Sequence, residues 1–430
     1  MAGGLDADRV ELAAVPSRPA ERTGLLAWWH ASDANAKRGL VAASLGWMVD
    51  MFDVQLYAMV LASLILHFDI ANSTGGLIGS LTLFSSAIGG VLFGLLADRW
   101  GRTRALMASI AIYTVFTGAS GLAQTVGQLA LIRVLLGIGV GGEWASGAAI
   151  VSETWRAEYR GKALAFMQSS AAFGKMLAAV VTAAVLPFWG WRAVFLVGVL
   201  PGCVCLWVCR SVKEPEIWRA SRAEGQPQGR FADIFRPPML RLTAAVTLMN
   251  GCTMFGWWGL NLWIPAYLSL PVAKGGIGLD TFEMSVLVFT MQIGMWLGYV
   301  TFGYASDALG RKRTYILYLL TASVAVLAYV ATKNAYALLV LGPFVAFFAS
   351  GHFSGFGVVT AEIYPTNIRA TAQGFTYNLG RVFSAIAPYV VGSLAEIHGF
   401  RSAMSICAVA YLLAAAFWIF IPETKGRSLA

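Results

Sequence analysis

Twelve apolar stretches, each long enough to cross a lipid bilayer, constrain this chain more than any other feature. A membrane-spanning helix needs about 20 mostly apolar residues. Gly, Pro and clusters of charge separate stretches of that length, and helices are expected over approximately 39–66, 74–97, 105–124, 128–152, 163–187, 192–209, 242–270, 283–306, 314–332, 335–361, 370–394 and 402–421. The sequence therefore predicts an all-α membrane protein with twelve transmembrane helices.

The longest polar segment between these stretches divides them into two sets of six. We expect a cytoplasmic N-terminal tail over 1–38, a first six-helix bundle over 39–210, a cytoplasmic linker over 211–241, a second bundle over 242–421 and a cytoplasmic tail over 422–430. The N-terminal tail has no long apolar core, so we do not expect a cleavable signal peptide. The first helix would then remain as an anchor.

Lys and Arg are distributed unevenly between the two sets of loops that twelve helices create. The set with both termini and the central linker holds 24 of the 31 Lys and Arg, and the opposite set holds four. Cytoplasmic loops of membrane proteins are enriched in these residues. We therefore expect both termini in the cytoplasm, in a bacterial inner (plasma) membrane. The net charge of +9 then follows from topology, and no nucleic-acid partner is expected.

An internal repeat relates the two sets of helices. Residues 94–104 read "GLLADRWGRTR", and residues 303–313, at an offset of 209, read "GYASDALGRKR". The same offset aligns Glu153 with Glu362. Parallel repeats of this kind place a substrate site at mid-membrane between the two halves and permit rocking of one half against the other.

Several motifs resemble the major facilitator superfamily, and the resemblance covers nearly the whole chain. The G-x-x-x-D-R-x-G-R pattern at Gly94–Arg102 is similar to the signature of its loop between helices 2 and 3. "RVLLGIGVGGEW" (133–144) resembles its metabolite–proton symporter branches, which carry acids of the sialate, monocarboxylate and aromatic type. "AEIYPTNIRATAQG" (361–374) and "PETKG" (422–426) resemble those branches and the sugar porters. The resemblance implies two pseudo-symmetric six-helix bundles and transport by alternating access.

The resemblance also implies a cytoplasmic gate built from ion pairs between helix ends. Single surface ion pairs contribute little to stability, but here the same charges recur in both halves. We expect them to tune the conformational equilibrium without binding substrate. The expected gate residues are Asp98, Arg102, Glu153, Arg160, Asp307, Arg311, Glu362 and Arg369.

Charged side chains inside the predicted helices are the candidates for the transport site, because idle charges are rare in membrane interiors. Asp53 lies about 21 Å along its helix from the cytoplasmic end, and Arg133 lies at about 22 Å, so the two can pair. Asp50 is one turn from Asp53 and on the same face. One cation cannot neutralise two aspartates, which leaves one carboxyl as a candidate proton carrier.

The repeat aligns Glu143 with His352. We expect these two side chains to face the central cavity from related positions and to change contact or protonation between states. A carboxylate that only stabilises helix packing is the alternative interpretation of Glu143. Together with Asp50, Asp53 and Arg133, the pair completes the set expected to couple transport to protons.

Lys175 and Arg381 offer one cation from each half at nearly the same depth. Arg suits bidentate recognition of a carboxylate, and Lys acts as a point charge, so the two predict an anionic substrate. Polar and aromatic residues nearby are expected to orient it. The full set of expected substrate-binding residues is Arg381, Lys175, Tyr57, Gln168, Trp258, Asn261, Tyr377 and Asn378.

These observations favour a monomeric secondary transporter that imports a small organic anion with protons. A sugar or polyol symporter is the nearest alternative, because "PETKG" and an Asp–Arg pair also suit it. A drug–proton antiporter is less favoured, since helix 5 carries Lys175 and lacks the G-P-x-x-G-G-like motif of such exporters. A membrane enzyme or a sensor is a further alternative, but we find no nucleophile–base pair or appended soluble domain. The five Cys suggest packing, and no cofactor or metal is expected besides the coupling proton.

Overall fold

The computed structural model describes residues 27–155, 157–214, 234–237, 239–365 and 368–425. Within these ranges the regular elements are all helices. The first half comprises α1 (Ala27–His30), α2 (Ala34–Phe68), α3 (Asn72–Trp100), α4 (Arg102–Ser120), α5 (Val126–Thr154), α6 (Ala157–Val197) and α7 (Val199–Cys209). The second half comprises α9 (Met239–Ser269), the 3₁₀ turn η2 (Val272–Lys274), α10 (Thr281–Leu309), α11 (Arg311–Ala331), α12 (Ala335–Gly351), α13 (Phe353–Ile363), α14 (Arg369–Ser384) and α15 (Ala387–Phe417).

Two long helices each contain a sharp turn at a glycine. Gly190 in α6 has φ 72°, and Gly399 in α15 has φ 75°. A left-handed backbone is accessible to glycine at no steric cost, so the chain reverses there and crosses back. The two turns lie 209 residues apart, as the repeat requires. Counted as crossings, the described helices give the predicted twelve-helix architecture in two bundles.

Helix ends depart from the predicted bounds where local capping chemistry decides them. The helix predicted from residue 39 begins at Ala34, because the Asp33 side chain accepts a hydrogen bond from the Ala36 N–H at 2.6 Å. The eleventh crossing is broken between α14 and α15. Pro388 has no N–H to continue the helical ladder, and the break falls about one turn beyond Arg381.

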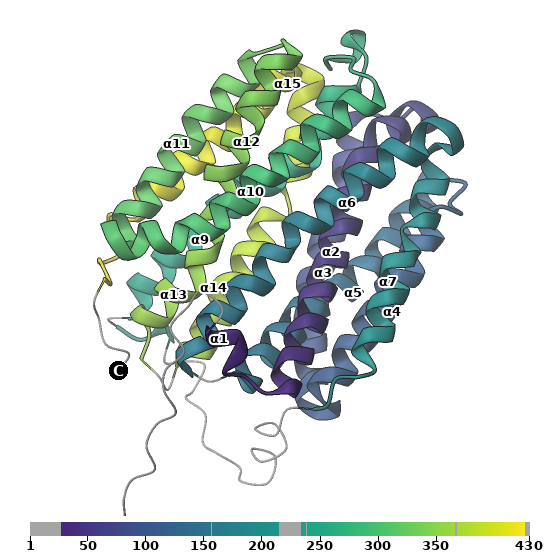
Figure 1. Cartoon of the computed structure of the whole chain (residues 1–430). Coiled ribbons are helices and arrows are strands. Elements are labelled where there is room, and N and C mark those ends of the chain that lie inside the picture. The colour runs from purple at the N-terminus through teal and green to yellow at the C-terminus, as the bar shows by residue number, and fades with distance from the viewer. Residues whose placement is uncertain (1–26, 156, 215–233, 238, 366–367, 426–430) are drawn as a thin grey trace, which may run out of the picture.

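The two halves pack along their length, as Figure 1 shows. α6 lies against α10, α2 lies against α9, and α3 lies against α15. We call the end of the bundle that carries α1 and the starts of α4 and α11 the α1 end. The opposite end, where α2 finishes and α3 begins, is called the distal end.

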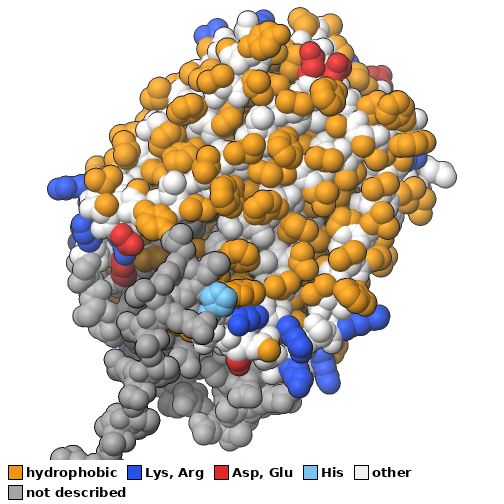
Figure 2. Space-filling view, in the orientation of Figure 1, with side chains coloured by type: hydrophobic (Ala, Val, Ile, Leu, Met, Phe, Trp, Pro, Cys, Tyr) orange, Lys and Arg blue, Asp and Glu red, His pale blue; other side chains and the backbone are white. Residues whose placement is uncertain are grey.

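The surface has the pattern expected for a membrane protein. In Figure 2, hydrophobic side chains cover the long sides of the visible face, and charged side chains gather at its two ends. Large apolar side chains such as Val91, Leu95 and Leu131 are more than half exposed. In the described part of the chain, eight helical spans are long and apolar enough to cross a membrane, and two of them, Gly161–Cys209 and Ala372–Phe417, contain two crossings each. The exposed apolar band is therefore the surface that contacts lipid.

Candidate functional site

Six charged side chains form a buried set at the centre of the molecule. Among the described residues they are the only Asp, Glu, Lys and Arg whose side chains are fully buried, and none is more than 3% exposed. Four helices supply them: α2, α5, α6 and α14. The set comprises Asp50, Asp53, Arg133, Glu143, Lys175 and Arg381.

Asp53 and Arg133 form the ion pair that their depths predicted. Arg133 Nη1 donates to Asp53 Oδ2 at 3.1 Å, and the Thr117 hydroxyl donates to Asp53 Oδ1 at 2.7 Å. The Arg133 guanidinium also lies over the Tyr57 ring, 4.7 Å from its centroid. The Tyr57 hydroxyl in turn donates to the Gly75 carbonyl at 2.9 Å. Tyr57 therefore packs against the cation of the ion pair, and its expected role in orienting a substrate stays a prediction.

Asp50 differs from Asp53, although one turn separates them. Neither Asp50 oxygen has a hydrogen-bond partner in the described part of the chain. Its charged surroundings are Arg381, Lys175, Arg133 and Asp53. Asp50 is thus a buried carboxyl that accepts no hydrogen bond from the described residues.

Lys175 is held by groups of the other half that carry no charge. Its ammonium donates to Asn261 Oδ1 and lies 4.0 Å from the centroid of the Trp257 ring. Trp257 is fixed by donation from its indole N–H to Ser350 Oγ at 3.0 Å. Lys175 and Asn261, both predicted to bind substrate, are thus brought together, whereas Trp257 was not in the predicted set.

No carboxylate pairs with Lys175 or Arg381 among the described residues. Lys175 of the first half and Arg381 of the second half are both buried. That the two cations converge on one anion stays a prediction.

Glu143 and His352 occupy equivalent positions but do not meet. His352 packs inside the second half against Tyr315, Phe353 and Tyr411, and its Nε2 has no partner. The Glu143 carboxyl contacts the backbone position of Gly46 inside the first half. In this conformation the two side chains lie apart, and the expectation that they change contact or protonation between states stays a prediction.

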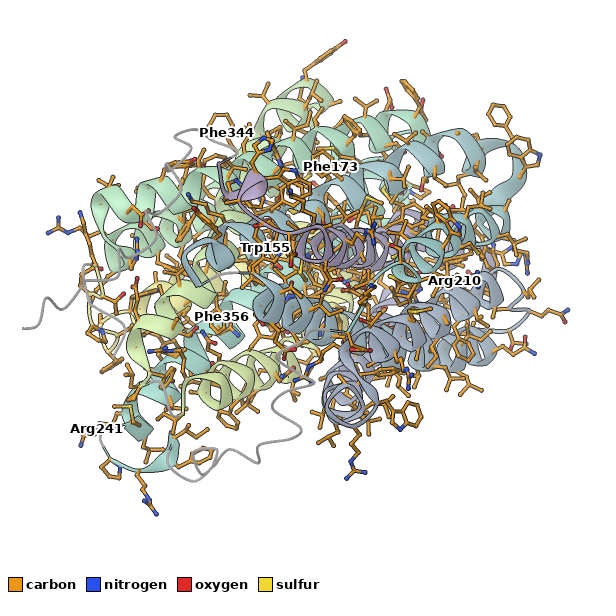
Figure 3. All side chains as sticks on the ribbon, turned by 60° about the horizontal axis from the view of Figure 1, so that its bottom comes forward. Trp155, Phe173, Arg210, Arg241, Phe344 and Phe356 are labelled. Atoms are coloured by element: carbon orange, nitrogen blue, oxygen red, sulfur yellow. The ribbon has the colours of Figure 1, made fainter. Side chains whose placement is uncertain are left out.

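An aromatic pair joins the two halves on the α1 side of these charges. Trp144 of α5 and Tyr377 of α14 stack with centroids 4.5 Å apart and planes inclined by 7°. Trp144 Nε1 donates to Gln168 Oε1 at 3.3 Å, and Phe356 packs against Tyr377. Figure 3 looks onto the α1 end and shows Phe356 on the second half. Sequence reasoning selected Tyr377 and Gln168 but missed Trp144, which adjoins Glu143.

Two other residues expected to bind substrate have local partners. Trp258 packs edge-on against Trp257 with centroids 4.7 Å apart. Asn378 donates to the Gly374 carbonyl at 2.9 Å. Both lie in the helices that carry Asn261 and Arg381, and no contact with a charged side chain is described for either.

The expected gate charges form equivalent ion pairs in the two halves. Arg102 lies 3.0 Å from Glu153, and Arg311 lies 3.1 Å from Glu362 and also pairs with Asp307. Each pair joins helices of the same half, so these contacts brace each bundle at the α1 end and do not cross between bundles.

Three further gate residues are less informative. Arg369 Nε donates to the Tyr364 carbonyl at 3.1 Å. The side chains of Asp98 and Arg160 lie outside the described residues.

Two glutamates that sequence reasoning missed cap the helices behind these ion pairs. Glu214 accepts from the N–H groups of Thr103 and Arg104 at 3.2 and 3.3 Å at the start of α4. Glu423 accepts from Arg311 N–H at 2.8 Å at the start of α11. The two glutamates are 209 residues apart, so extending the repeat to the ends of the halves could have found them.

The local charge environment of Glu423 reflects this capping role. Partial burial raises the pKa of the Glu423 carboxyl. Four backbone N–H donors lower that pKa by more than burial raises it; they belong to Lys425, Arg311, Thr424 and Lys312. The net pKa lies below the ordinary value of a glutamate.

The distal end of the central region is closed by direct contacts between halves. Glu396 Oε1 of α15 accepts from Ser73 N–H of α3 at 2.6 Å, and Ser80 Oγ accepts from Tyr389 N–H at 3.1 Å. A Cβ added to Gly76 would overlap the Pro388 carbonyl. The two backbones thus approach closely at this end, and the buried charges are shut off from it.

Clusters suited to metals are not evident in the described ranges. No group of three or more His, Cys, Asp or Glu gathers there. Cys205 and Cys209 Sγ atoms lie 4.0 Å apart, and both side chains are buried. All five cysteines are free thiols.

Comparison with known proteins agrees with this architecture. The family model described as "Major Facilitator Superfamily" matches residues 43–274 and 268–429. The chain is 33% identical to a "Probable 4-methylmuconolactone transporter" of Cupriavidus pinatubonensis, over 94% of this chain and 95% of that protein. It is 29% identical to a sialic acid transporter of Escherichia coli, over 90% and 94% of the two chains. A solved structure of the xylose transporter of E. coli superposes with a TM-score of 0.75 at 20% identity, covering 92% of this chain and all of the other.

Proposed function

The chain belongs to the major facilitator superfamily, and we propose that it imports small organic anions by proton symport with alternating access. The protein is a multi-pass membrane transporter and no enzyme. In the proposed cycle, a carboxyl of the buried set takes up a proton from outside and the anion binds near Lys175 and Arg381. Rocking of the two halves then opens the α1 end, and the proton and the anion are released there.

The anion proposal rests on one observation, the absence of a paired carboxylate beside Lys175 and Arg381 in the described part of the chain. Lys175 and Arg381 are buried at the interface of the halves, and no described carboxylate pairs with them. A buried cation without an anion is costly, whereas a bound carboxylate would supply the missing charge. Relatives named for sialic acid and 4-methylmuconolactone transport are consistent with small organic substrates.

Proton coupling is proposed from the carboxyls of the same set. Asp50, Asp53 and Glu143 are buried in the same set as Arg133 and Arg381, and Asp53 pairs with Arg133. Protonation of a buried carboxyl changes the net charge of the region and hence the stability of each conformation. Such a change can bias a two-state equilibrium. His352 lies apart from this cluster and has no place in the proposed coupling step.

The orientation is likewise a proposal. Most Lys and Arg of the sequence fall in the loops predicted to share a side with both termini, and Figure 2 shows several Lys and Arg at the α1 end. The positive-inside rule then places the α1 end and both termini in the cytoplasm of a bacterial inner membrane. The distal end would face outward, closed in this conformation. We propose a monomer, since each chain holds a complete site.

A neutral-sugar symporter is the second candidate, because the Asp53–Arg133 pair does not itself require an anion. Lys175 and Arg381 argue against it, since a neutral solute would leave both cations without a counter-charge. Drug–proton antiport has no comparable structural support.

Uptake into proteoliposomes with an inward proton gradient tests the proposal. The purified protein is offered a panel of radiolabelled carboxylic acids and sugars at matched concentration. We expect gradient-driven accumulation of at least one acid, with liposomes lacking protein as the baseline. Accumulation of a sugar and of no acid would overturn the proposal.

A further inference from the structure

We propose that the first half binds the headgroup of an anionic phospholipid at the α1 end, between the start of α4 and the end of α7. Three cationic side chains, Arg104, Arg210 and Lys213, define this place, which we call the α4–α7 corner. They would hold the lipid phosphate, while the acyl chains lie along α7. The corner is separate from the buried charges, so this inference does not depend on what the protein transports.

The Glu214 side chain brings the three cationic residues to one place. Its carboxylate oxygens accept from the N–H groups of Thr103 and Arg104 at 3.2 and 3.3 Å. The segment directly after α7 therefore lies at the first turn of α4, and the two helices also pack against each other. Arg210 and Lys213 belong to that segment, so they lie beside Arg104.

The three cationic side chains are available to a ligand. All three are exposed, and no hydrogen bond or ion pair of their side chains with any described residue is present. The neighbouring Glu214 carboxylate is already occupied by backbone N–H groups. Three cations and one carboxylate leave a net positive charge, which complements a phosphate. Arginine can bind phosphate through two parallel hydrogen bonds, and lysine binds it as a point charge.

An apolar stripe leads from the α4–α7 corner along α7, and it favours a lipid over a free anion. Leu200, Val204 and Trp207 recur at helical spacing on one face and are 63, 57 and 72% exposed. Trp207 lies one turn before Arg210. Tryptophan is enriched at the level of lipid headgroups, which places the adjoining cations at that level. The acyl chains of a lipid held there can follow the stripe.

The second half has the same backbone arrangement without this set of side chains. Glu423 replaces Glu214 and caps α11 in the same way, so the cap itself requires no basic cluster. Lys312 and Lys425 at that end donate to backbone carbonyl groups of their own half. At the offset of 209, Trp207 aligns with Ala416, Arg210 with Ile419 and Lys213 with Pro422.

This difference between the halves argues against a purely topological role for the α4–α7 corner. The positive-inside rule requires Lys and Arg in loops on one side of the membrane, but it does not require them to gather beside an exposed tryptophan. Figure 2 shows Lys and Arg side chains grouped at the α1 end of the first half, and Figure 3 labels Arg210 there. Basic pockets between transmembrane helices are a known way of binding anionic lipid headgroups.

Native mass spectrometry of the purified full chain in detergent tests the inference. The protein is offered phosphatidylglycerol and phosphatidylcholine with identical acyl chains at equal concentration. We expect the parent to retain phosphatidylglycerol preferentially. Each Lys or Arg near an anionic lipid surface strengthens binding about five-fold. Arg210→Gln/Lys213→Gln should therefore bind phosphatidylglycerol about 25-fold more weakly, with phosphatidylcholine unchanged.

The matched control removes two exposed cations from the α1 end of the second half. Arg313→Gln/Lys425→Gln should retain phosphatidylglycerol as the parent does. A photoreactive phosphatidylglycerol should label residues 199–213 of the parent and lose this labelling in Arg210→Gln/Lys213→Gln. Excess inorganic phosphate should not displace the lipid.

Four results would overturn the inference. They are equal retention of the two lipids by the parent, equal weakening in both double variants, photolabelling confined to the second half, and displacement of the lipid by inorganic phosphate, which would indicate a simple anion site. If Arg210→Gln/Lys213→Gln does not fold, the single variants decide, and each should weaken binding about five-fold. Transport is not measured in these experiments, so their outcome is independent of the proposed function.

Discussion

Asp53 receives two donors of different kinds, and their removal should have unequal effects. Arg133→Met leaves a buried carboxylate without its cation, which typically costs about 3–5 kcal/mol. Thr117→Val removes one hydrogen bond to a charged group, worth about 1–3 kcal/mol in soluble proteins and less on average in membranes. We expect the arginine variant to lose clearly more thermal stability in detergent.

The double variant Asp53→Asn/Arg133→Met provides the control for this prediction. It removes both charges together, so it should regain much of the stability that Arg133→Met loses. Thr117→Ser keeps the hydroxyl and should resemble the parent. A double variant as unstable as Arg133→Met would show that the charge pairing is not the cause.

Charge and depth were sufficient to predict the Asp53–Arg133 pair, but other contacts of the site were not accessible from the sequence. Thr117 carries no charge and looks like any polar residue of an apolar helix. Glu143 and His352 were expected to face the central cavity from related positions because the repeat relates them, and in this conformation they do not touch. Residues related by a repeat occupy equivalent places in separate bundles, and they meet only if they lie on the axis between the bundles.

At the scale of elements, the glutamate caps of α4 and α11 connect the sequence repeat to helix stability. The pKa of Glu423 is below its ordinary value of 4.5, so its contribution to stability is fully present above that value. It is lost as the pH falls through the lower folded-state pKa. We predict that Glu423→Gln reduces the loss of thermal stability below about pH 4.5, measured by melting in detergent.

Glu283, which caps α10 within its own helix, offers the comparison for this prediction. In the variant Glu283→Gln, thermal stability should fall more steeply with decreasing pH than it does in Glu423→Gln. The capping argument would be contradicted if the parent and Glu423→Gln lost thermal stability equally as the pH falls.

The glutamate caps join elements of one half, whereas the stack of Trp144 on Tyr377 joins elements of different halves. Parallel rings 4.5 Å apart leave no space for a substrate between them, and they join the two halves between the buried charges and the α1 end. We predict that Trp144→Ala raises the rate of substrate exchange and the access of a water-soluble thiol reagent to a cysteine placed near Arg381.

Trp144→Phe keeps an aromatic ring and serves as the control for this closure. It should remain closer to the parent in both measurements, although it loses the hydrogen bond to Gln168. Equal access in the parent and in Trp144→Ala would show that the rings do not seal the route.

Periodicity, glycine placement and the repeat predicted the twelve helices well, because apolar length and turn chemistry are local properties. Residues Gly190 and Gly399 lie within the two turns expected from the sequence. The ends of helices were less accessible, since Asp33 and Pro388 act through single hydrogen bonds gained or lost. Which helices meet across the two bundles depends on the conformational state, and one sequence must encode more than one state.

At the scale of the whole molecule, the distal contacts should bias the equilibrium between these states. The N-terminus of α3 has no side-chain cap of its own, and Glu396 of the other half supplies the carboxylate. A charge at a helix N-terminus is worth about 0.3–1 kcal/mol, and this one is available only while the halves touch. Glu396→Ala should therefore reduce the ratio of closed to open molecules by about two- to five-fold.

Distances between spin labels at positions 69 and 397 would measure this shift, since both are exposed at the distal end. Glu283→Ala also removes a carboxylate from a helix start, but within one half, and should leave the distance distribution unchanged. Gly76→Val should act more strongly than Glu396→Ala, because its added side chain would overlap the Pro388 carbonyl and prevent close approach. A closed population that survives Gly76→Val would mean that α3 and α15 can close without this contact, and the distal seal would then have to lie elsewhere along the interface.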